Sequence, residues 1–380
     1  MFKPLVIGIG YMIPSKNRSK WLKKQFEFSG PTYIKIGQFI ANRRDVFGTE
    51  LSSEMENLQD NVSQVPWSRI SPQVNLENFD SVDQVPIATA SISQVHRGVY
   101  KGKQVAIKVK KPDIHRELAS DIDTLKKYIK MFPSCERALI DFEGAIEKEL
   151  DFENEILNIQ NFSTIYEFSN TVEVPRVYTE ACSSNVIVMN FLEKTKNVPN
   201  AESLINIFVD QLLYEGVIHG DLHSGNIGVG KDGKIILYDF GNVIHVPKSY
   251  RLNMRDFVYY MQMKNTKGVL ATMKRMGMKI VDEKTTITFI DKFFTYIDTL
   301  DIKSFTFDPT EIQEKVPVVM DKTTFTLLRS YSLLEGYCKK IEPQFSYDNI
   351  LRRALELLYL DSDYIVYRAR KDLNMFTFNK

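Results

Sequence analysis

One segment constrains the fold of this chain more than any other: VIHGDLHSGNIGVGKDGKIILYDFG, residues 217–241. Short apolar runs alternate in it with loops, and the loops carry Asp221, Asn226 and Asp239. Between the runs, Lys231-Asp232-Gly233 has the composition of a hairpin turn. Carboxylate and amide oxygens are the ligands that hard divalent cations prefer. The segment therefore predicts a polar site on loops between short strands.

The spacing within this segment is that of a protein-kinase catalytic loop. Such a loop has an Asp followed five positions later by an Asn, then a hairpin and Asp-Phe-Gly. In that pattern Asn226 and Asp239 would hold Mg²⁺ against the phosphates of ATP, and Asp221 would orient or deprotonate an attacking hydroxyl. Upstream, VAIK (105–108) ends a predicted strand, so Lys108 would pair with the α- and β-phosphates.

The order of apolar patterns, strand-rich and then helix-rich, predicts a two-lobed α+β arrangement, and the catalytic-loop spacing makes it protein-kinase-like. We expect helices within 31–62, broken at Gly48, and over 113–131 and 141–168. Strands are expected at 172–178 and 185–191, and a polar linker at 63–86. The predicted domains are a basic and apolar segment (1–29), the helical extension (30–85), an N-lobe with inserted helices (86–192) and a helical C-lobe (193–380).

Composition limits the partners and the compartment. The 49 basic and 48 acidic residues leave a net charge of +1, which does not indicate nucleic-acid binding. The cysteines Cys135, Cys182 and Cys338 are scattered, which favours a reducing intracellular compartment. No apolar run reaches the length of a spanning helix. Membrane contact would be peripheral, through Leu5–Ile13 and the basic stretch 15–24 with Trp21.

Three features depart from an ordinary kinase. The phosphate-covering loop reads Ala88-Thr89-Ala90-Ser91 instead of a glycine-rich loop, Gly220 replaces the Arg of His-Arg-Asp, and no Ala-Pro-Glu segment follows Gly241. A peptide-docking surface is therefore not expected. The residues also leave open which glutamate pairs with Lys108, because Glu117, Glu149 and Glu155 all lie in predicted helices.

These departures occur together with further motifs: GPTYIKIGQ (30–38), PIATASISQVH (86–96), ELDFENE (149–155) and HGDLHSGN (219–226). With them the chain resembles the UbiB/aarF-domain (ADCK-like) atypical protein-kinase-like family from residue 30 to about residue 355. The alanine loop is a feature of that family and not a decayed glycine loop.

The resemblance implies a protein-kinase-like fold with a helical N-terminal extension over the active site, and it implies a role for several residues. Lys35 and Gln38 would belong to a Lys-x-Gly-Gln helix folded over the active site, and Glu149 with Asp151 would form a Glu-x-Asp pair. Glu155 would be the glutamate paired with Lys108. Residues 88–91 would cover the nucleotide. The strand at 185–191 should lead into the hinge, so backbone near Asn190–Leu192 would meet adenine.

The resemblance also implies a function: a magnesium-dependent ATP-binding enzyme, an ATPase, that supports prenylquinone or lipid metabolism and takes a lipid or quinone-like small molecule as partner. Two alternatives stay open. One is a genuine phosphotransferase acting on a protein or small molecule, and the presence of Asp221 supports it. The other is a nucleotide-binding scaffold without catalysis. The intact catalytic set argues against a scaffold: Lys108, Asp221, Asn226 and Asp239.

Overall fold

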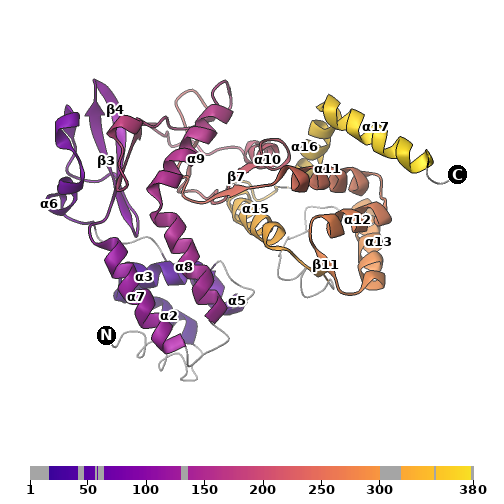
Figure 1. The fold of residues 1–380 in the computed structure, drawn as a ribbon, viewed down its shortest axis with the longest axis horizontal. Coiled ribbons are helices and arrows are strands. Elements are labelled where there is room, and N and C mark those ends of the chain that lie inside the picture. Colours follow the sequence, from indigo (N-terminus) through magenta and orange to yellow (C-terminus); the bar gives the residue numbers. More distant parts are fainter. Residues whose placement is uncertain are drawn as a thin grey trace. The chain divides into compact units, whose positions relative to one another are not determined.

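The computed structural model describes residues 17–41, 47–55, 58, 64–129, 136–299, 318–345 and 348–377 (Figure 1). The chain divides into two compact units. The first unit contains residues 1–193 together with Asp239–Gly241, and the second unit contains Lys194–Tyr238 and Asn242–Lys380. The apolar stretch Leu5–Ile13 and Cys135 lie outside the described residues.

An antiparallel sheet forms the centre of the first unit. Its strands are β1 (Ser81–Val82), β2 (Ala88–Thr89), β3 (Ser93–Tyr100), β4 (Lys103–Lys110) and β6 (Val186–Asn190). They run in the order β1-β3-β4-β6, with β2 also paired to β3. The β3–β4 hairpin turns at Lys101 (φ 48°) and Gly102 (φ 73°), two positive-φ residues that suit a two-residue turn.

Strand β4 has two differently used faces because successive side chains of a strand point to opposite sides. Val105, Ile107 and Val109 are buried in one apolar cluster with residues of β6 and of the segment before β1. Lys108 and its alternate neighbours therefore lie on the other face. The apolar packing of one face holds the lysine side chain in place on the other.

The helical extension has its own core. Helices α2 (Arg18–Ser29), α3 (Pro31–Ala41) and α5 (Thr49–Met55) share a cluster that includes Leu22, Phe26, Tyr33, Ile40, Leu51 and Met55. The break expected at Gly48 is confirmed, since Gly48 has φ 77° and α5 begins directly after it. Trp21 is partly buried against this cluster. Trp21 thus packs with the helices that follow it.

Three further helices follow the sheet's central hairpin: α7 (Ile114–Ile129), α8 (Glu136–Leu150) and α9 (Phe152–Ile165). The prediction of one helix over 141–168 was wrong, because the chain breaks at Asp151 and starts α9 there (Figure 1). The Asp151 carboxylate accepts a hydrogen bond of 2.9 Å from the Asn154 backbone N–H. An aspartate that caps a helix in this way favours a new start over continuation.

The polar linker expected at 63–86 was also wrong in part. It contains α6 (Trp67–Ile70), two short 3₁₀ turns, η1 (Ser71–Gln73) and η2 (Leu76–Asn78), and strand β1. The buried Gln94 side chain holds its start, with Oε1 accepting from the Val65 N–H and Nε2 donating to the Val65 carbonyl at 3.2 Å. Downstream, β5 (Val172–Glu173) is shorter than expected, and a 3₁₀ turn, η4 (Thr179–Ala181), precedes β6.

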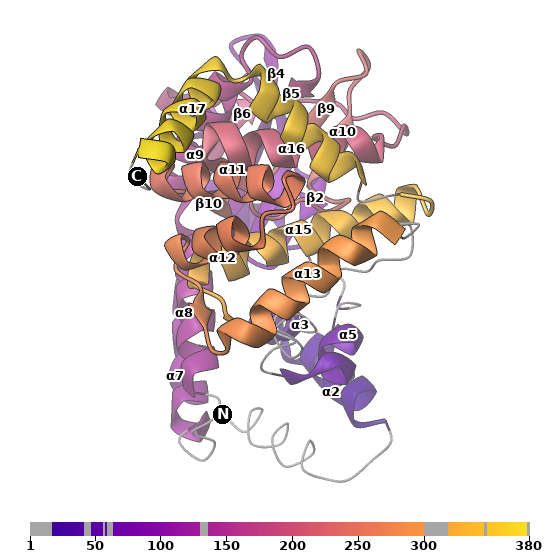
Figure 2. The same ribbon diagram turned by 90° about the vertical axis from the view of Figure 1, so that its right-hand side faces the viewer.

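The second unit is mainly helical. Its short strands are β7 (Val217–His219) paired with β10 (Val243–His245), β8 (Ile227–Val229) with β9 (Ile235–Leu237), and β11 (Lys279–Ile280) with β12 (Val318–Val319). Its helices are α10 (Ala201–Asp210), the π-helix η5 (Gln211–Glu215), α11 (Lys248–Gln262), α12 (Thr266–Arg275), α13 (Glu283–Thr299), α15 (Lys322–Ile341), α16 (Asp348–Leu360) and α17 (Ser362–Thr377) (Figure 2). Within the described ranges, no helix is both long and apolar enough to cross a membrane.

We expect Asp151→Ala to lower the free energy of unfolding by about 1 kcal/mol, because it removes the cap of α9. Asp151→Asn is the matched control, since asparagine caps helices about as well, and it should unfold like the wild type. Urea unfolding followed by circular dichroism measures both. Equal losses in the two variants would show that the charge of Asp151, not its capping bond, matters.

Candidate active site

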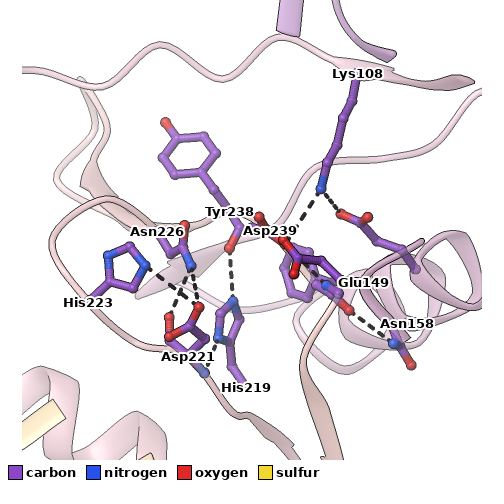
Figure 3. A network of polar contacts seen from close by, with 12 residues as sticks. Lys108, Glu149, Asn158, His219, Asp221, His223, Asn226, Tyr238 and Asp239 are labelled. Carbon is purple, nitrogen blue, oxygen red and sulfur yellow. Dashed lines mark hydrogen bonds and ion pairs between the residues drawn. The ribbon is translucent and has the colours of Figure 1, made fainter. Parts of the chain in front are cut away.

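Lys108 is the central cation of the first unit. It is only 9% exposed, and its Nζ lies 2.6 Å from Glu155 Oε1 and 3.5 Å from Asp239 Oδ1. Figure 3 shows the Lys108 side chain reaching from its strand toward Asp239. The Phe152 ring also lies beneath the ammonium, 5.4 Å from it. Among the three glutamates that the sequence left open, Glu155 is the one that contacts Lys108. Glu117 is exposed on α7.

The electrostatics of the pair depend on burial. Burial disfavours the charged form of Lys108, but Asp239 and Glu155 outweigh it and raise the pKa of the ammonium. Burial raises the pKa of the Glu155 carboxyl, and Lys108 opposes that shift. Lys108 is therefore a firmly charged group, and the ionised form of Glu155 relies on it. Such a cation can bind an anion without first having to gain a proton.

One face of α9 joins this lysine to the Asp-Phe-Gly segment. Glu155, Asn158 and Phe162 are all buried on it. The Asn158 side chain donates a hydrogen bond of 3.0 Å to the Phe240 carbonyl, and the Phe162 and Phe240 rings lie 5.0 Å apart. We did not predict Asn158 or Phe162 from the sequence. Their spacing from Glu155, three and seven residues, places all three on one helical face and was the available signal.

Asp239 has an unusual backbone. Its φ is 56°, in the left-handed region that residues with a Cβ seldom occupy. Its Oδ1 accepts a hydrogen bond of 3.2 Å from the Gly241 N–H, which supports this conformation. Its side chain is 48% exposed. Strained backbone of this kind is concentrated at functional sites, where the surrounding structure holds it.

In the loop after β7, three polar side chains lie close to one another. The Asn226 side chain donates to the Asp221 carbonyl at 3.1 Å and to Asp221 Oδ2 at 3.4 Å. His223 Nε2 lies 3.6 Å from the same Oδ2, and Figure 3 shows the three side chains together. Because the Asn226 amide nitrogen faces Asp221, its Oδ1 is the atom that can ligate a cation. The Asp221 side chain stays 40% exposed.

His219 is a fully buried scaffold residue. Its Nε2 lies 2.8 Å from the Tyr238 carbonyl, and its Nδ1 accepts from the Asp221 N–H at 3.3 Å (Figure 3). A carbonyl can only accept and an N–H can only donate, so these two contacts together select the neutral ring protonated at Nε2. His219 therefore fixes the backbone of Asp221 and does not act as a base.

Gly220, where an ordinary kinase has arginine, fits a crowded position. Its N–H donates 2.8 Å to the Asn242 carbonyl. A Cβ at Gly220 would lie 2.7 Å from that carbonyl oxygen, closer than real Cβ contacts. A larger side chain at position 220 would require the backbone at Asn242 to move, which explains why glycine stands here and not arginine.

The alanine loop consists of strand β2 and the bend that leads from it into β3. Ala88 and Thr89 pair with Val95 and Gln94 of β3, and the Ala90 N–H donates to the Ser93 carbonyl at 2.9 Å. No residue from Ala88 to Ser91 has a positive φ, so this loop does not need glycine. The Ser91 hydroxyl is buried and finds no hydrogen-bond partner in the described part of the chain.

The extension is tied to the rest of the first unit by polar contacts of α3. Lys35 Nζ lies 2.6 Å from Glu149 Oε1 near the end of α8, and the Thr32 hydroxyl lies 2.5 Å from Asp121 Oδ2 on α7. Gln38 is half-buried on the same helix. A Cβ at Gly37 would lie 2.0 Å from Leu58 Cδ1, so this glycine allows close packing. The structure thus brings Lys35 and Glu149 together.

At the end of β6, where the adenine contact was expected, part of the backbone is already hydrogen-bonded within the protein. The Asn190 N–H donates to the Arg176 carbonyl at 3.0 Å, and the Phe191 N–H donates to the Gln104 carbonyl at 3.0 Å. The Asn190 side chain accepts from the Arg176 N–H at 2.5 Å. These bonds fix the exit of β6 in one conformation.

The fold and these residues define a mixed α+β protein-kinase-like protein. Residues 57–273 match the model of the ABC1 atypical kinase-like domain. The chain belongs to this family, the ABC1/aarF (UbiB) family. It is 27% identical to "Uncharacterized protein in hydrogenase 1 5'region" of Clostridium pasteurianum over 90% of this chain. It is also 27% identical to "Protein ACTIVITY OF BC1 COMPLEX KINASE 8, chloroplastic" of Arabidopsis thaliana, again over 90% of this chain.

The curated relatives are longer than this chain. The aligned part covers 72% of the clostridial protein, 54% of the Arabidopsis protein and 63% of a Synechocystis relative. Among solved structures, the chain is similar to Mycobacterium tuberculosis Rv3197 in its complex with erythromycin. The TM-score is 0.54 at 20% identity, covering 74% of this chain and 84% of that one. This similarity concerns the fold.

We expect Lys108→Met to destabilise the protein by about 3 kcal/mol at neutral pH, because it leaves Glu155 buried without its cation. Burial then raises the pKa of Glu155 unopposed. Stability should be retained where Glu155 is protonated and be lost as the pH rises above the ordinary carboxyl value of 4.5. Thermal unfolding between acidic and neutral pH measures this slope.

Two controls accompany this experiment. Lys108→Met combined with Glu155→Leu should recover much of the stability and lose the added pH dependence, since no buried charge remains. Lys103→Met removes an exposed lysine from the same strand and should have little effect. If Lys108→Met unfolds with the pH dependence of the wild type, the assigned charge coupling is wrong.

Proposed function

We propose that this protein is a magnesium-dependent ATPase of the atypical kinase-like type. The observation that carries the proposal is the buried Lys108, charged and held by Glu155 at 2.6 Å beside the strained Asp239. A cation fixed in this way matches the phosphate-pairing lysine of protein kinases, and Asp239 matches their metal-binding Asp-Phe-Gly aspartate. Family membership supports the same chemistry.

Each unit would contribute defined groups. Lys108 would pair the α- and β-phosphates, and the turn formed by Ala88–Ser91 would cover them. The N–H groups of Asn190 and Phe191 are engaged in the sheet, so we place the adenine contact at Leu192 and the segment after it. Asp221, partly exposed and held by Asn226, would orient the attacking water or hydroxyl.

The residues fit magnesium. The Asn226 Oδ1 and the Asp239 carboxylate are hard oxygen donors, the kind that Mg²⁺ takes in small number together with phosphate oxygens. Among the described residues no cluster of three His, Cys, Asp or Glu forms a metal site by itself. A cation there would thus depend on the bound phosphates. Bound Mg²⁺ would neutralise charge on the phosphate oxygens.

We further propose that α3 covers the face where a peptide substrate would bind, and that the nucleotide cycle serves prenylquinone or other lipid chemistry. The 2.6 Å contact between Lys35 and Glu149 supports a docked α3, and the lack of an Ala-Pro-Glu segment argues against peptide docking. The prenylquinone and lipid role comes from the family resemblance, and the partner would be a lipid or quinone-like small molecule.

The test is steady-state phosphate release from MgATP by the purified full chain, with and without anionic liposomes containing a quinone-like phenol. Asp239→Asn should lower release by about a hundredfold or more, since it removes one metal ligand and a charge near Lys108. Asp232→Asn, in the exposed turn between β8 and β9, is the matched control and should keep wild-type release.

The outcomes separate the alternatives. Release stimulated by lipid and lost in Asp239→Asn supports the ATPase. Transfer of phosphate onto a particular protein, unaffected by deletion of residues 1–60, supports a phosphotransferase, for which the exposed Asp221 carboxylate is the favouring observation. MgATP binding without release or transfer indicates a scaffold.

We expect Lys35→Met to increase hydrogen exchange in residues 31–41, because it removes a half-buried ion pair worth about 1 kcal/mol. Lys23→Met on α2, where Lys23 lies 3.9 Å from Glu27, is the control and should leave exchange unchanged. Unchanged exchange in α3 after Lys35→Met would mean that its apolar packing alone holds this helix.

A further inference from the structure

A π-helix lies directly before the strand that leads to Asp221. It is η5 (Gln211–Glu215), and its wide turn is closed by the Gly216 N–H donating 2.8 Å to the Gln211 carbonyl five residues back. Isolated π turns are rare and often occur at functional sites. They displace carbonyl groups from the regular helical ladder, and those groups need other donors.

Two arginines of α11 supply these donors. Arg255 Nε donates 2.9 Å to the Leu213 carbonyl, and Arg251 Nη1 donates to the Tyr214 carbonyl. The Arg255 guanidinium also stacks on the Tyr214 ring at 4.3 Å. Gly216 ends the turn with φ 70°, a left-handed conformation that favours glycine, and the Arg251 side chain packs directly against it. The arginines of α11 therefore contact the π turn along its carbonyl groups and at its end.

The π-helix is linked to the catalytic loop through Gln211. This glutamine is fully buried, and its Oε1 accepts a hydrogen bond of 3.0 Å from the backbone N–H of His219. The ring Nδ1 of His219 in turn accepts a hydrogen bond of 3.3 Å from the backbone N–H of Asp221. The orientation of Gln211 thus affects the backbone position of Asp221 through two successive hydrogen bonds.

Arg255 is oriented by the C-terminal helices α16 and α17. Arg255 Nη1 lies 2.7 Å from Asp361 Oδ2, at the junction of α16 and α17. Asp361 Oδ1 accepts from the Tyr364 N–H at 2.9 Å, and the Tyr214 hydroxyl donates 2.5 Å to the Leu357 carbonyl. Figure 2 shows α16 and α17 above α11, inclined to it. This helix pair lies beyond the residues matched by the family model, which end at 273.

A buried network fixes α17 to α11 next to this contact. Asp256, fully buried, accepts from Arg368 Nη1 at 3.2 Å and from the Tyr364 hydroxyl at 3.1 Å. Arg368 lies over the rings of Tyr259 and Tyr260 at 4.4 and 4.5 Å. A charge pair without exposure to water holds its geometry closely. Asp361 is therefore presented to Arg255 in one position.

We propose that Arg255, oriented by Asp361, is a positioning residue for the catalytic loop: it holds the π turn, which sets Gln211 and thereby the backbone of Asp221. Only the catalytic consequence rests on the proposed function. Without Arg255, the Leu213 carbonyl and Asp361 lose their common donor. The π turn can then relax toward an α-helix, which rotates Gln211 away from His219.

The experiment compares Arg255→Gln, Asp361→Asn and a control in the full chain. Hydrogen exchange of residues 217–226 reports the loop independently of turnover, and phosphate release gives kcat and KM for MgATP. We expect Arg255→Gln to speed exchange in this segment and to lower kcat by about ten- to a hundredfold, with KM nearly unchanged. Asp361→Asn should have a smaller effect of the same kind.

Lys274→Gln is the control. Lys274 on α12 lies 2.6 Å from Glu283 on α13, so this pair also joins two helices of the second unit, but neither residue belongs to the π turn, α11, α16 or α17. Lys274→Gln should leave loop exchange and kcat as in the wild type. Arg255→Lys should not restore kcat, because one ammonium group cannot bond the Leu213 carbonyl and Asp361 at the same time as the planar guanidinium does.

Two results would overturn the proposal. One is wild-type exchange at 217–226 with wild-type kcat in Arg255→Gln. The other is exchange that rises throughout the second unit in both Arg255→Gln and Lys274→Gln, which shows general destabilisation. If exchange rises only at 217–226 while even the wild type releases no phosphate, the positional link is supported and the ATPase proposal fails.

Discussion

The ion pair between Lys108 and Glu155 is the constraint on which the first unit depends. Two charges removed from water must be matched closely, so the strand and the helix that carry them cannot shift independently. The apolar face of β4 fixes the lysine, and the cap at Asp151 fixes where α9 begins. The same helix then holds Phe240 through Asn158 and Phe162. One helix therefore sets both the cation and the Asp-Phe-Gly segment.

The second unit holds the loop that carries Asp221 differently, with hydrogen bonds to the backbone. His219 connects the Asp221 N–H to the Tyr238 carbonyl, and Gly220 is pressed against Asn242. Behind them, arginine side chains of α11 satisfy the carbonyl groups of a π turn. The contacts of His219 and Gly220 thus hold this loop without adding charge, whereas the π turn behind it is held by two cations of α11.

Much of the local structure followed from the sequence. The break at Gly48 and the loop and hairpin around Asp221, Asn226 and Asp239 have short-range causes, namely positive φ and strand alternation. The prediction of one helix over 141–168 was wrong because the apolar periodicity continues across Asp151. Periodicity alone does not reveal a capping side chain. The family, likewise, was evident from motif order alone.

The sequence by itself determined the family, the kinase-like α+β class and the identity of the chemical groups, because these depend on residue types at fixed spacing. The residues alone left Glu117, Glu149 and Glu155 equivalent, and the resemblance pointed to Glu155; only the tertiary structure decided that Glu155 meets Lys108, because this contact forms when the helices pack on the sheet. The tertiary structure also decided the contacts of Asn158, Gln211 and Arg255. Each of them bonds a residue at least eight positions away, and such contacts arise from packing and not from local spacing.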